Sequence, residues 1–316
     1  MRPASSGRAS LIDILYSYVF YLLNISKIAA KLLKNYEMAK DFSLSIIKVI
    51  KIKCKMGIIC GKYCNFAPEF NKKRKIMNYN DFHYGAVSQN RDLEMQAAFP
   101  VLMRKVYTWM TLALVLTGFT AYGVATSPGI LTALFSNSAL MWGLVIAEFA
   151  LVFGISAAIN RLSLATATLM FVAYSVINGA LLSSIFIIYT ASSITSVFFI
   201  TAATFAVMAL IGYTTKTDLT SVGKLLFMAL IGLVIATIVN MFIGSSTMTM
   251  ICSYVGVLIF VGLTAYDSQK IKQMLQQAPD AGEASQKLAL LGALSLYLDF
   301  INLFIYLLRI FGDRKD

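Results

Sequence analysis

The sequence is short of charged residues, and its few cysteines are poorly placed for a metal site. Only 13% of its 316 residues are Asp, Glu, Lys or Arg, whereas a soluble domain carries about 25%. A soluble globular protein is therefore excluded, and most of the chain must lie in lipid. Three of the four cysteines, Cys54, Cys60 and Cys64, lack the tight paired spacing and the partner histidine of a zinc site.

Basic residues are concentrated in the first quarter of the chain. Residues 1–76 hold 15 of the 27 Lys and Arg and have a net charge of +11, against +1 for residues 77–316. Their best apolar run, residues 11–25, is shorter than the ~20 residues needed to span a membrane and contains Asp13. We expect residues 1–76 to be a basic N-terminal extension, either disordered or upstream of a true start at Met77. Residues 77–105 are expected to be a cytosolic pre-helical segment.

Seven apolar stretches, each about the length needed to cross a membrane, follow this segment. They cover residues 106–126, 139–159, 164–189, 194–213, 222–243, 249–268 and 288–311. The sequence therefore predicts an all-α membrane protein, with a bundle of seven transmembrane helices formed by residues 106–316. Glycines within the spans, Gly212 and Gly232 among them, are expected to allow close packing of helices in lipid.

The charges between the spans indicate an orientation. Residues 127–138, 190–193 and 244–248 contain no charged residue, whereas basic residues gather in the connections on the other side. They are Arg104, Lys105, Arg161, Lys216, Lys270, Lys272 and Lys287. The positive-inside rule places this basic side, and with it the start of the first span, in the cytosol. Arg314 and Lys315 are mild exceptions on the opposite side.

Each of the last two spans contains a carboxylate, Asp267 and Asp299. A charged side chain at membrane depth is costly, so it usually faces the protein interior or a water path and marks an ion or proton site. The two aspartates are therefore a candidate sensor for protons and a transient site for Ca²⁺. For their side chains to meet, the sixth helix must tilt or must extend past Lys270.

The seventh span also carries a polar stripe. Residues with polar or charged side chains follow one another at spacings of 4, 3, 4 and 3, which places them on one face of a helix. They are Ser295, Asp299, Asn302, Tyr306 and Arg309. Because such a face cannot point to lipid at low cost, the last helix is predicted to be central in the bundle. A hydrogen-bonded polar seam with no further role is the alternative interpretation.

Two arginines are candidate partners for the carboxylates. Arg309, near the outer end of the seventh span, is predicted to form a structural ion pair with Glu148 of the second span, because buried charges are usually paired. Arg161 follows the second span on the cytosolic side, where Asp267 also lies. It is therefore a candidate competitor of a cation for the aspartates.

The stretches around the two aspartates, residues 265–271 (AYDSQKI) and 296–304 (LYLDFINLF), resemble the transmembrane Bax inhibitor motif family, in particular its bacterial members. The resemblance covers about residues 90–312, with Tyr-Asp-Ser-Gln where the family typically has Tyr-Asp-Thr-Gln. It implies a seven-helix bundle and a pH-sensitive calcium leak whose sensor matches Asp267 and Asp299. It also implies an arginine latch on the helix-six aspartate, for which Arg161 is the candidate, and a location in the bacterial inner membrane.

Three functions remain open. The first is a cation leak in which protons and Ca²⁺ compete for the carboxylate oxygens, with no cofactor beyond the permeant ion. The second is an intramembrane aspartyl protease, which we do not expect, because residues 296–299 (LYLD) lack the glycines of the Gly-x-Gly-Asp motif. The third is a non-transporting regulator that binds a membrane protease or another membrane protein. Lipid is the expected environment, and no nucleic-acid partner is expected.

Overall fold

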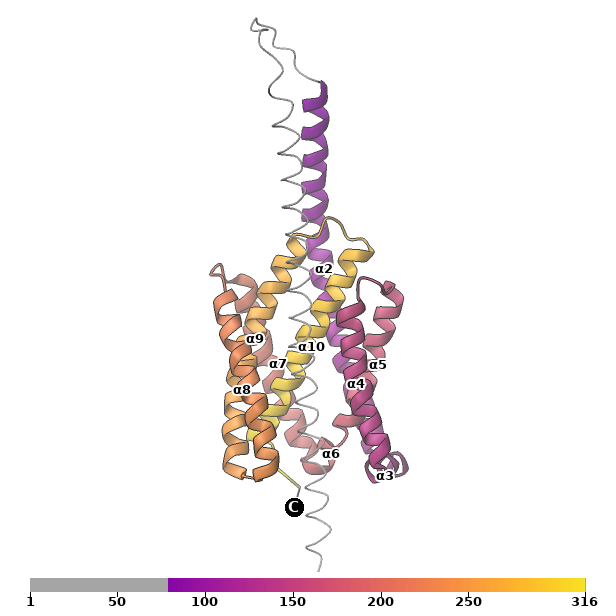
Figure 1. Cartoon of the computed structure of the whole chain (residues 1–316), viewed down its shortest axis with the longest axis vertical. Helices are drawn as coiled ribbons and strands as arrows, with labels where there is room; N and C mark the ends of the chain where they lie inside the picture. Colours follow the sequence, from indigo (N-terminus) through magenta and orange to yellow (C-terminus); the bar gives the residue numbers. More distant parts are fainter. Residues whose placement is uncertain (1–78, 316) are drawn as a thin grey trace, which may run out of the picture.

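The computed structural model describes residues 79–315, with side-chain surroundings from residue 97 onward. The predicted extension, residues 1–76, lies outside the described residues. The described chain folds into helices joined by short connections (Figure 1). They are α2 (Tyr79–Ala125), α3 (Pro128–Ser136), α4 (Ser138–Ala158), α5 (Leu164–Leu182), α6 (Ile185–Ile188), α7 (Ala191–Thr214), α8 (Thr220–Ile243), α9 (Ser246–Gln276) and α10 (Glu283–Phe311).

Seven of these segments are long and apolar enough to cross a membrane, which confirms the predicted all-α membrane bundle. They are Ala97–Ala125, Ser138–Ala158, Leu164–Ile188, Ala191–Thr214, Thr220–Ile243, Ser246–Gln276 and Glu283–Phe311. The third combines α5 with the single turn of α6. The short helix α3 lies between the first and second spans.

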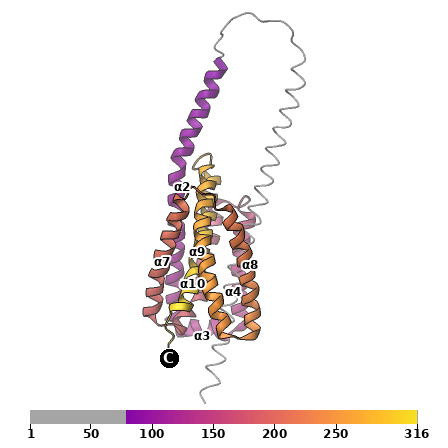
Figure 2. The same ribbon diagram turned by 90° about the vertical axis from the view of Figure 1, so that its left-hand side faces the viewer.

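The last helix is at the centre, as predicted. In the most apolar stretch of α10, 94% of the residues are buried inside the protein, against 22–56% in the other six spans. α10 packs on α9, α2, α7 and α5, while α8 packs on the outside of α9 and α4 on α5. Figures 1 and 2, two views at right angles, both place α10 among the other helices.

Two predicted boundaries are corrected. Residues 79–105 are not a pre-helical segment, because α2 runs without a break from Tyr79 into its apolar part, which begins at Ala97. A hydropathy criterion finds only the apolar part of such a helix, whereas residues 93–98 (LEMQAA) are good helix formers that continue it. The sixth transmembrane helix, α9, extends past Lys270 to Gln276. This extension places Asp267 well inside the helix rather than at its end.

The two ends of the bundle differ in charge. Basic residues gather toward the end where α9 finishes and α10 begins (Figure 1), and we call this the basic end. They are Arg104 and Lys105 of α2, Arg161 and Lys216 in connections, Lys270 and Lys272 of α9, and Lys287 of α10. At the opposite end the chain after α10 is held by the α6–α7 connection, where the Thr190 amide donates to the Asp313 carbonyl (3.1 Å) and the Lys315 amide to the Ile188 carbonyl (2.9 Å). The Lys315 ammonium donates a hydrogen bond to the Phe186 carbonyl at 2.7 Å. Lys315 is one of the two basic residues that are exceptions to the positive-inside rule, and this bond gives its charge a partner within the protein.

Candidate functional site

Asp267 of α9 and Asp299 of α10 are both buried where these two helices meet, with 2% and 0% of their surfaces exposed. The hydroxyl of Ser295 on α10 donates to Asp267 Oδ2 at 2.6 Å. Residues four apart on a helix lie about 5–6 Å apart on the same face. Asp299 is therefore one turn of α10 away from the hydrogen bond that fixes Asp267, and the structure brings both aspartates to one interface.

The residues before Asp267 set how closely α9 approaches its other neighbours. The backbone of Ala265 lies directly against Gly212 of α7, so close that a Cβ at Gly212 would overlap the Ala265 carbonyl. The ring of Tyr266 lies over Gly223 of α8, where a Cβ would overlap it in the same way. Each contact depends on a glycine in the partner helix. Asp267 thus sits on a helix that is pressed against α7 and α8 as well as α10.

The residues after Asp267 hold the α7–α8 region in place. The Ser268 hydroxyl donates to the Ala209 carbonyl of α7 at 2.8 Å. The Gln269 side chain accepts from the Leu219 amide (2.8 Å) and donates to the carbonyls of Thr217 (2.8 Å) and Thr215 (3.3 Å), so it fixes the connection between the two helices. All five residues from Ala265 to Gln269 therefore have a defined contact. Of these five residues, the sequence alone indicates a role only for Asp267.

The polar stripe of α10 lies inside the bundle, with Ser295, Asp299, Asn302 and Tyr306 all buried. The Asn302 amide donates to the Leu298 carbonyl of its own helix at 2.7 Å. The Tyr306 ring stacks on Phe260 of α9 with ring centroids 5.9 Å apart. The stripe therefore faces α9 over several turns.

A second buried polar group lies between α2, α4, α5 and α10. Glu148, 1% exposed, accepts a hydrogen bond from the Asn178 amide (2.9 Å), and the same amide contacts the Tyr174 hydroxyl at 3.2 Å. The Thr117 hydroxyl donates to the Ser175 carbonyl (3.0 Å) and lies 2.7 Å from the Tyr297 hydroxyl, from which it accepts. The hydroxyls of Thr117, Tyr174 and Tyr297 were not expected in this group, because tyrosine and threonine within apolar spans resemble ordinary packing residues.

Arg309, the partner predicted for Glu148, lies at a different depth along α10. Glu148 is near Tyr297, whereas Arg309 is half-buried near Cys252 of α9. Arg309 follows Tyr297 by 12 residues, about 18 Å along α10 at 1.5 Å per residue. The structure gives Glu148 the Asn178 amide as a partner, and the ion pair between Glu148 and Arg309 stays a prediction.

Arg161 lies in the connection between α4 and α5, and its side chain is exposed. Its near neighbour Leu164 donates its amide to Glu283 Oε1 at 3.0 Å, which places this connection beside the first turn of α10. Ser295, the partner of Asp267, follows Glu283 by 12 residues, about 18 Å along the helix. The latch from Arg161 to Asp267 stays a prediction, and it requires movement from this position.

Within residues 97–315, no group of three or more His, Cys, Asp and Glu side chains is arranged to hold a metal ion. Asp267 and Asp299 are two anionic side chains buried at the α9–α10 interface. A pair of carboxylates suits an ion that binds briefly, because a resident Ca²⁺ takes six to eight oxygen ligands.

Residues 100–316 match the family described as inhibitor of apoptosis-promoting Bax1. The chain belongs to this Bax inhibitor family. It is 49% identical over 224 residues to the inner membrane protein YbhL of Escherichia coli, a match that covers 71% of this chain and 96% of YbhL. It is 45% identical to an uncharacterized protein of Borreliella burgdorferi (68% and 92% covered) and 42% identical to the uncharacterized protein RP147 of Rickettsia prowazekii (68% and 90%).

Membership of the Bax inhibitor family agrees with the resemblance expected from residues 265–271 and 296–304, and it places the chain in a lipid bilayer. The matched region contains all seven spans apart from the first three residues of α2's apolar part. The chain is therefore an integral membrane protein of this family over its whole described bundle.

Proposed function

We propose that the protein is a pH-sensitive leak for Ca²⁺, controlled by Asp267 and Asp299 and involving no enzymatic reaction. The observation that carries the proposal is that both carboxylates are buried at the α9–α10 interface, and that Ser295, which donates to Asp267, lies one helical turn before Asp299 on α10. Ionised carboxylates at membrane depth are rarely kept without a functional role. A purely structural seam is served equally well by neutral Ser, Thr and Asn.

The two states of the site follow from the chemistry of carboxylates. Two carboxylates in one buried site cannot both be ionised at low cost, so in the closed state they share a proton. When the proton leaves, the negative charges either separate or bind a cation. Ca²⁺ prefers oxygen ligands, and protons therefore compete with it for the same atoms.

Asn302 adds a neutral oxygen to this site. It lies three residues after Asp299 on the same face of α10, and its Oδ1 is buried without a hydrogen-bond partner among the described residues. An amide oxygen is a suitable Ca²⁺ ligand. Two carboxylates and one amide still supply fewer oxygens than Ca²⁺ requires, so the ion keeps part of its water and leaves easily, as a permeant ion must.

Arg161 and the basic end complete the proposal. With the basic end in the cytosol, as the positive-inside rule favours, the N-terminal end of α2 is cytosolic, and Arg161 lies at the end of the bundle where α9 finishes, beyond Asp267. In a more tightly closed state the Arg161 guanidinium pairs with Asp267 and competes with the cation. In the present structure Arg161 is exposed, so this state needs a movement of the α4–α5 connection.

The test is Ca²⁺ flux into proteoliposomes at pH values from 6 to 8. Asn has the shape of Asp but cannot titrate, so Asp267→Asn and Asp299→Asn should each flatten the pH dependence of the flux. The two effects need not be equal, because the proton belongs to the pair. Asp218→Asn is the matched control, since Asp218 is an exposed carboxylate in the α7–α8 connection and should keep the wild-type profile.

A wild-type pH profile in both aspartate variants would reject the paired sensor. The aspartates would then be a polar seam, and the protein would be a membrane regulator that acts by binding a membrane protease or another membrane protein.

A further inference from the structure

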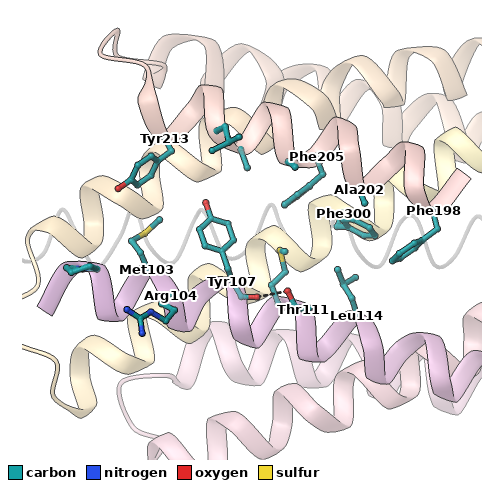
Figure 3. Close-up of a pocket in the computed structure, with 15 residues that line it drawn as sticks. Met103, Arg104, Tyr107, Thr111, Leu114, Phe198, Ala202, Phe205, Tyr213 and Phe300 are labelled. Atoms are coloured by element: carbon teal, nitrogen blue, oxygen red, sulfur yellow. Dashed lines mark hydrogen bonds between the residues drawn. The ribbon is translucent and has the colours of Figure 1, made fainter.

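A cavity of about 700 Å³ lies between α2 and α7, and no residue of the polar stripe of α10 lines it. Its walls are Met103, Tyr107 and Leu114 on α2 and Phe205 and Tyr213 on α7, and Phe300 of α10 also lines it. Figure 3 shows the labelled side chains of the two walls on either side of the hollow. The cavity is therefore a groove between two transmembrane helices.

The groove opens toward the lipid rather than toward the centre of the bundle. Two of its lining residues on α7, Phe198 and Leu210, are 40% and 62% exposed. Exposed apolar side chains on the outer face of a membrane-spanning bundle contact acyl chains, because no water is present at that depth. The occupant of the groove is accordingly a hydrocarbon chain.

The length of the groove matches one leaflet of a bilayer. Arg104 and Leu114 line it ten residues apart on α2, a distance of about 15 Å along the helix. This is half of the ~30 Å hydrocarbon core of a membrane. A single lipid that enters from the basic end fits the groove without crossing the midplane.

Cationic groups are found at only one end of the groove. Arg104 is the single charged residue among its described lining side chains, and Figure 3 places Arg104 and Tyr213 at one end and Leu114 and Phe198 at the other. The ammonium of Lys272 lies 4.8 Å from the centroid of the Tyr213 ring and donates to the Tyr213 carbonyl at 2.8 Å. Two cations thus lie at the end where a lipid headgroup would be.

We infer that this groove binds an anionic phospholipid, with an acyl chain between α2 and α7 and the phosphate at Arg104. A zwitterionic lipid fits the apolar part equally well, but its headgroup carries no net charge to interact with the cations. The inference does not rest on the proposed calcium leak, because it concerns the outer face of the bundle.

The test uses the full-length protein in detergent, supplied with phosphatidylglycerol or with phosphatidylcholine having the same acyl chains. Native mass spectrometry measures how much of each lipid the protein retains. We expect the wild type to retain the anionic lipid preferentially, and Arg104→Gln to reduce that preference about five-fold, the effect of one basic residue near a membrane surface. Lys216→Gln, which removes an exposed cation that does not line the groove, should leave the preference unchanged.

A second pair of variants tests the groove itself. Ala206→Phe fills it from α7, and we expect a loss of both lipids. Ala203→Phe places the same ring on an exposed position of α7 outside the groove and should have no effect. Equal retention of the two lipids by the wild type would overturn the inference, as would equal losses in the Ala206 and Ala203 variants. A protein dimer that disappears with Ala206→Phe while lipid retention is unchanged would also overturn it, because a second copy of the chain would then occupy the groove.

Discussion

Gly212→Ala should destabilise the bundle, although alanine is the better helix former. Gly212 on α7 lies against the backbone of Ala265, two residues before Asp267 on α9. A Cβ at this position would overlap the Ala265 carbonyl, and a backbone atom cannot rotate away as a side chain can. The two helices would therefore have to move apart.

The expected cost combines packing and hydrogen bonding. Overfilling a well-packed contact costs about 1–3 kcal/mol. If α7 and α9 move apart by about 0.5–1 Å, the rest of their interface loses a quarter to a half of its dispersion attraction. The Ser268 hydrogen bond to the Ala209 carbonyl, 2.8 Å long, crosses the same interface and would lengthen. Such bonds in membranes contribute about 0.6–1.7 kcal/mol. The higher helix propensity of alanine offsets about 1 kcal/mol. We expect a net loss of about 1–3 kcal/mol.

Gly232→Ala is the matched control. Gly232 lies within α8, and a Cβ there would meet no atom within 4 Å. The same substitution should therefore be neutral or stabilise the protein by up to about 1 kcal/mol. Reversible unfolding in mixed micelles of mild detergent and dodecyl sulfate measures both variants. Equal stabilities for the two would refute the close α7–α9 contact.

Three further predictions concern contacts away from the aspartate pair. Gln269→Ala removes three hydrogen bonds to the α7–α8 connection. We expect a loss of about 2–3 kcal/mol and faster cleavage of that connection in limited proteolysis. Unchanged cleavage would show that Gln269 does not hold the connection in place. Thr117→Val and Tyr297→Phe should each cost about 0.6–1.7 kcal/mol in the same unfolding assay. Their double variant should cost less than the sum, because both remove one shared hydrogen bond, and fully additive losses would speak against it. Glu148→Gln should lower stability, because the Asn178 amide then loses its carboxylate acceptor at 2.9 Å. An ion pair with Arg309 would let Arg309→Gln recover part of a loss of about 3–5 kcal/mol. The distance of about 18 Å along α10 from Tyr297 to Arg309 favours additive losses instead, and those would exclude the pair.

The sequence predicts well those features that the surrounding lipid imposes on a single helix. The spacing of Ser295, Asp299, Asn302 and Tyr306 identified α10 as the central helix, because a polar face cannot point to acyl chains at low cost. The seven spans follow from the same property. Both predictions need only the composition and period of one segment.

Contacts between helices could not be predicted in this way. Gly212 and Gly232 are both glycines in apolar spans, yet one touches the backbone of α9 and the other meets no neighbouring atom. Thr117 and Tyr297 are 180 residues apart in the chain, and nothing in their local sequence indicates that their hydroxyls meet. Helix length was also underestimated, since charged residues such as Lys270 end an apolar window without ending a helix. The Gln269 contacts depend on this extension of α9.

The position of α10 has a consequence for how the protein is assembled. α10 follows the other six spans in the chain, yet it fills the centre that they surround. Synthesis adds about 5–20 residues per second, so the six earlier spans reach the membrane before their central partner exists. Until then Asp267 lacks the Ser295 hydroxyl of α10 as its hydrogen-bond donor, so its carboxylate contacts lipid or water. α10 must enter between helices already in place, and its bonds from Ser295 to Asp267 and from Tyr297 to Thr117 form together in one late step.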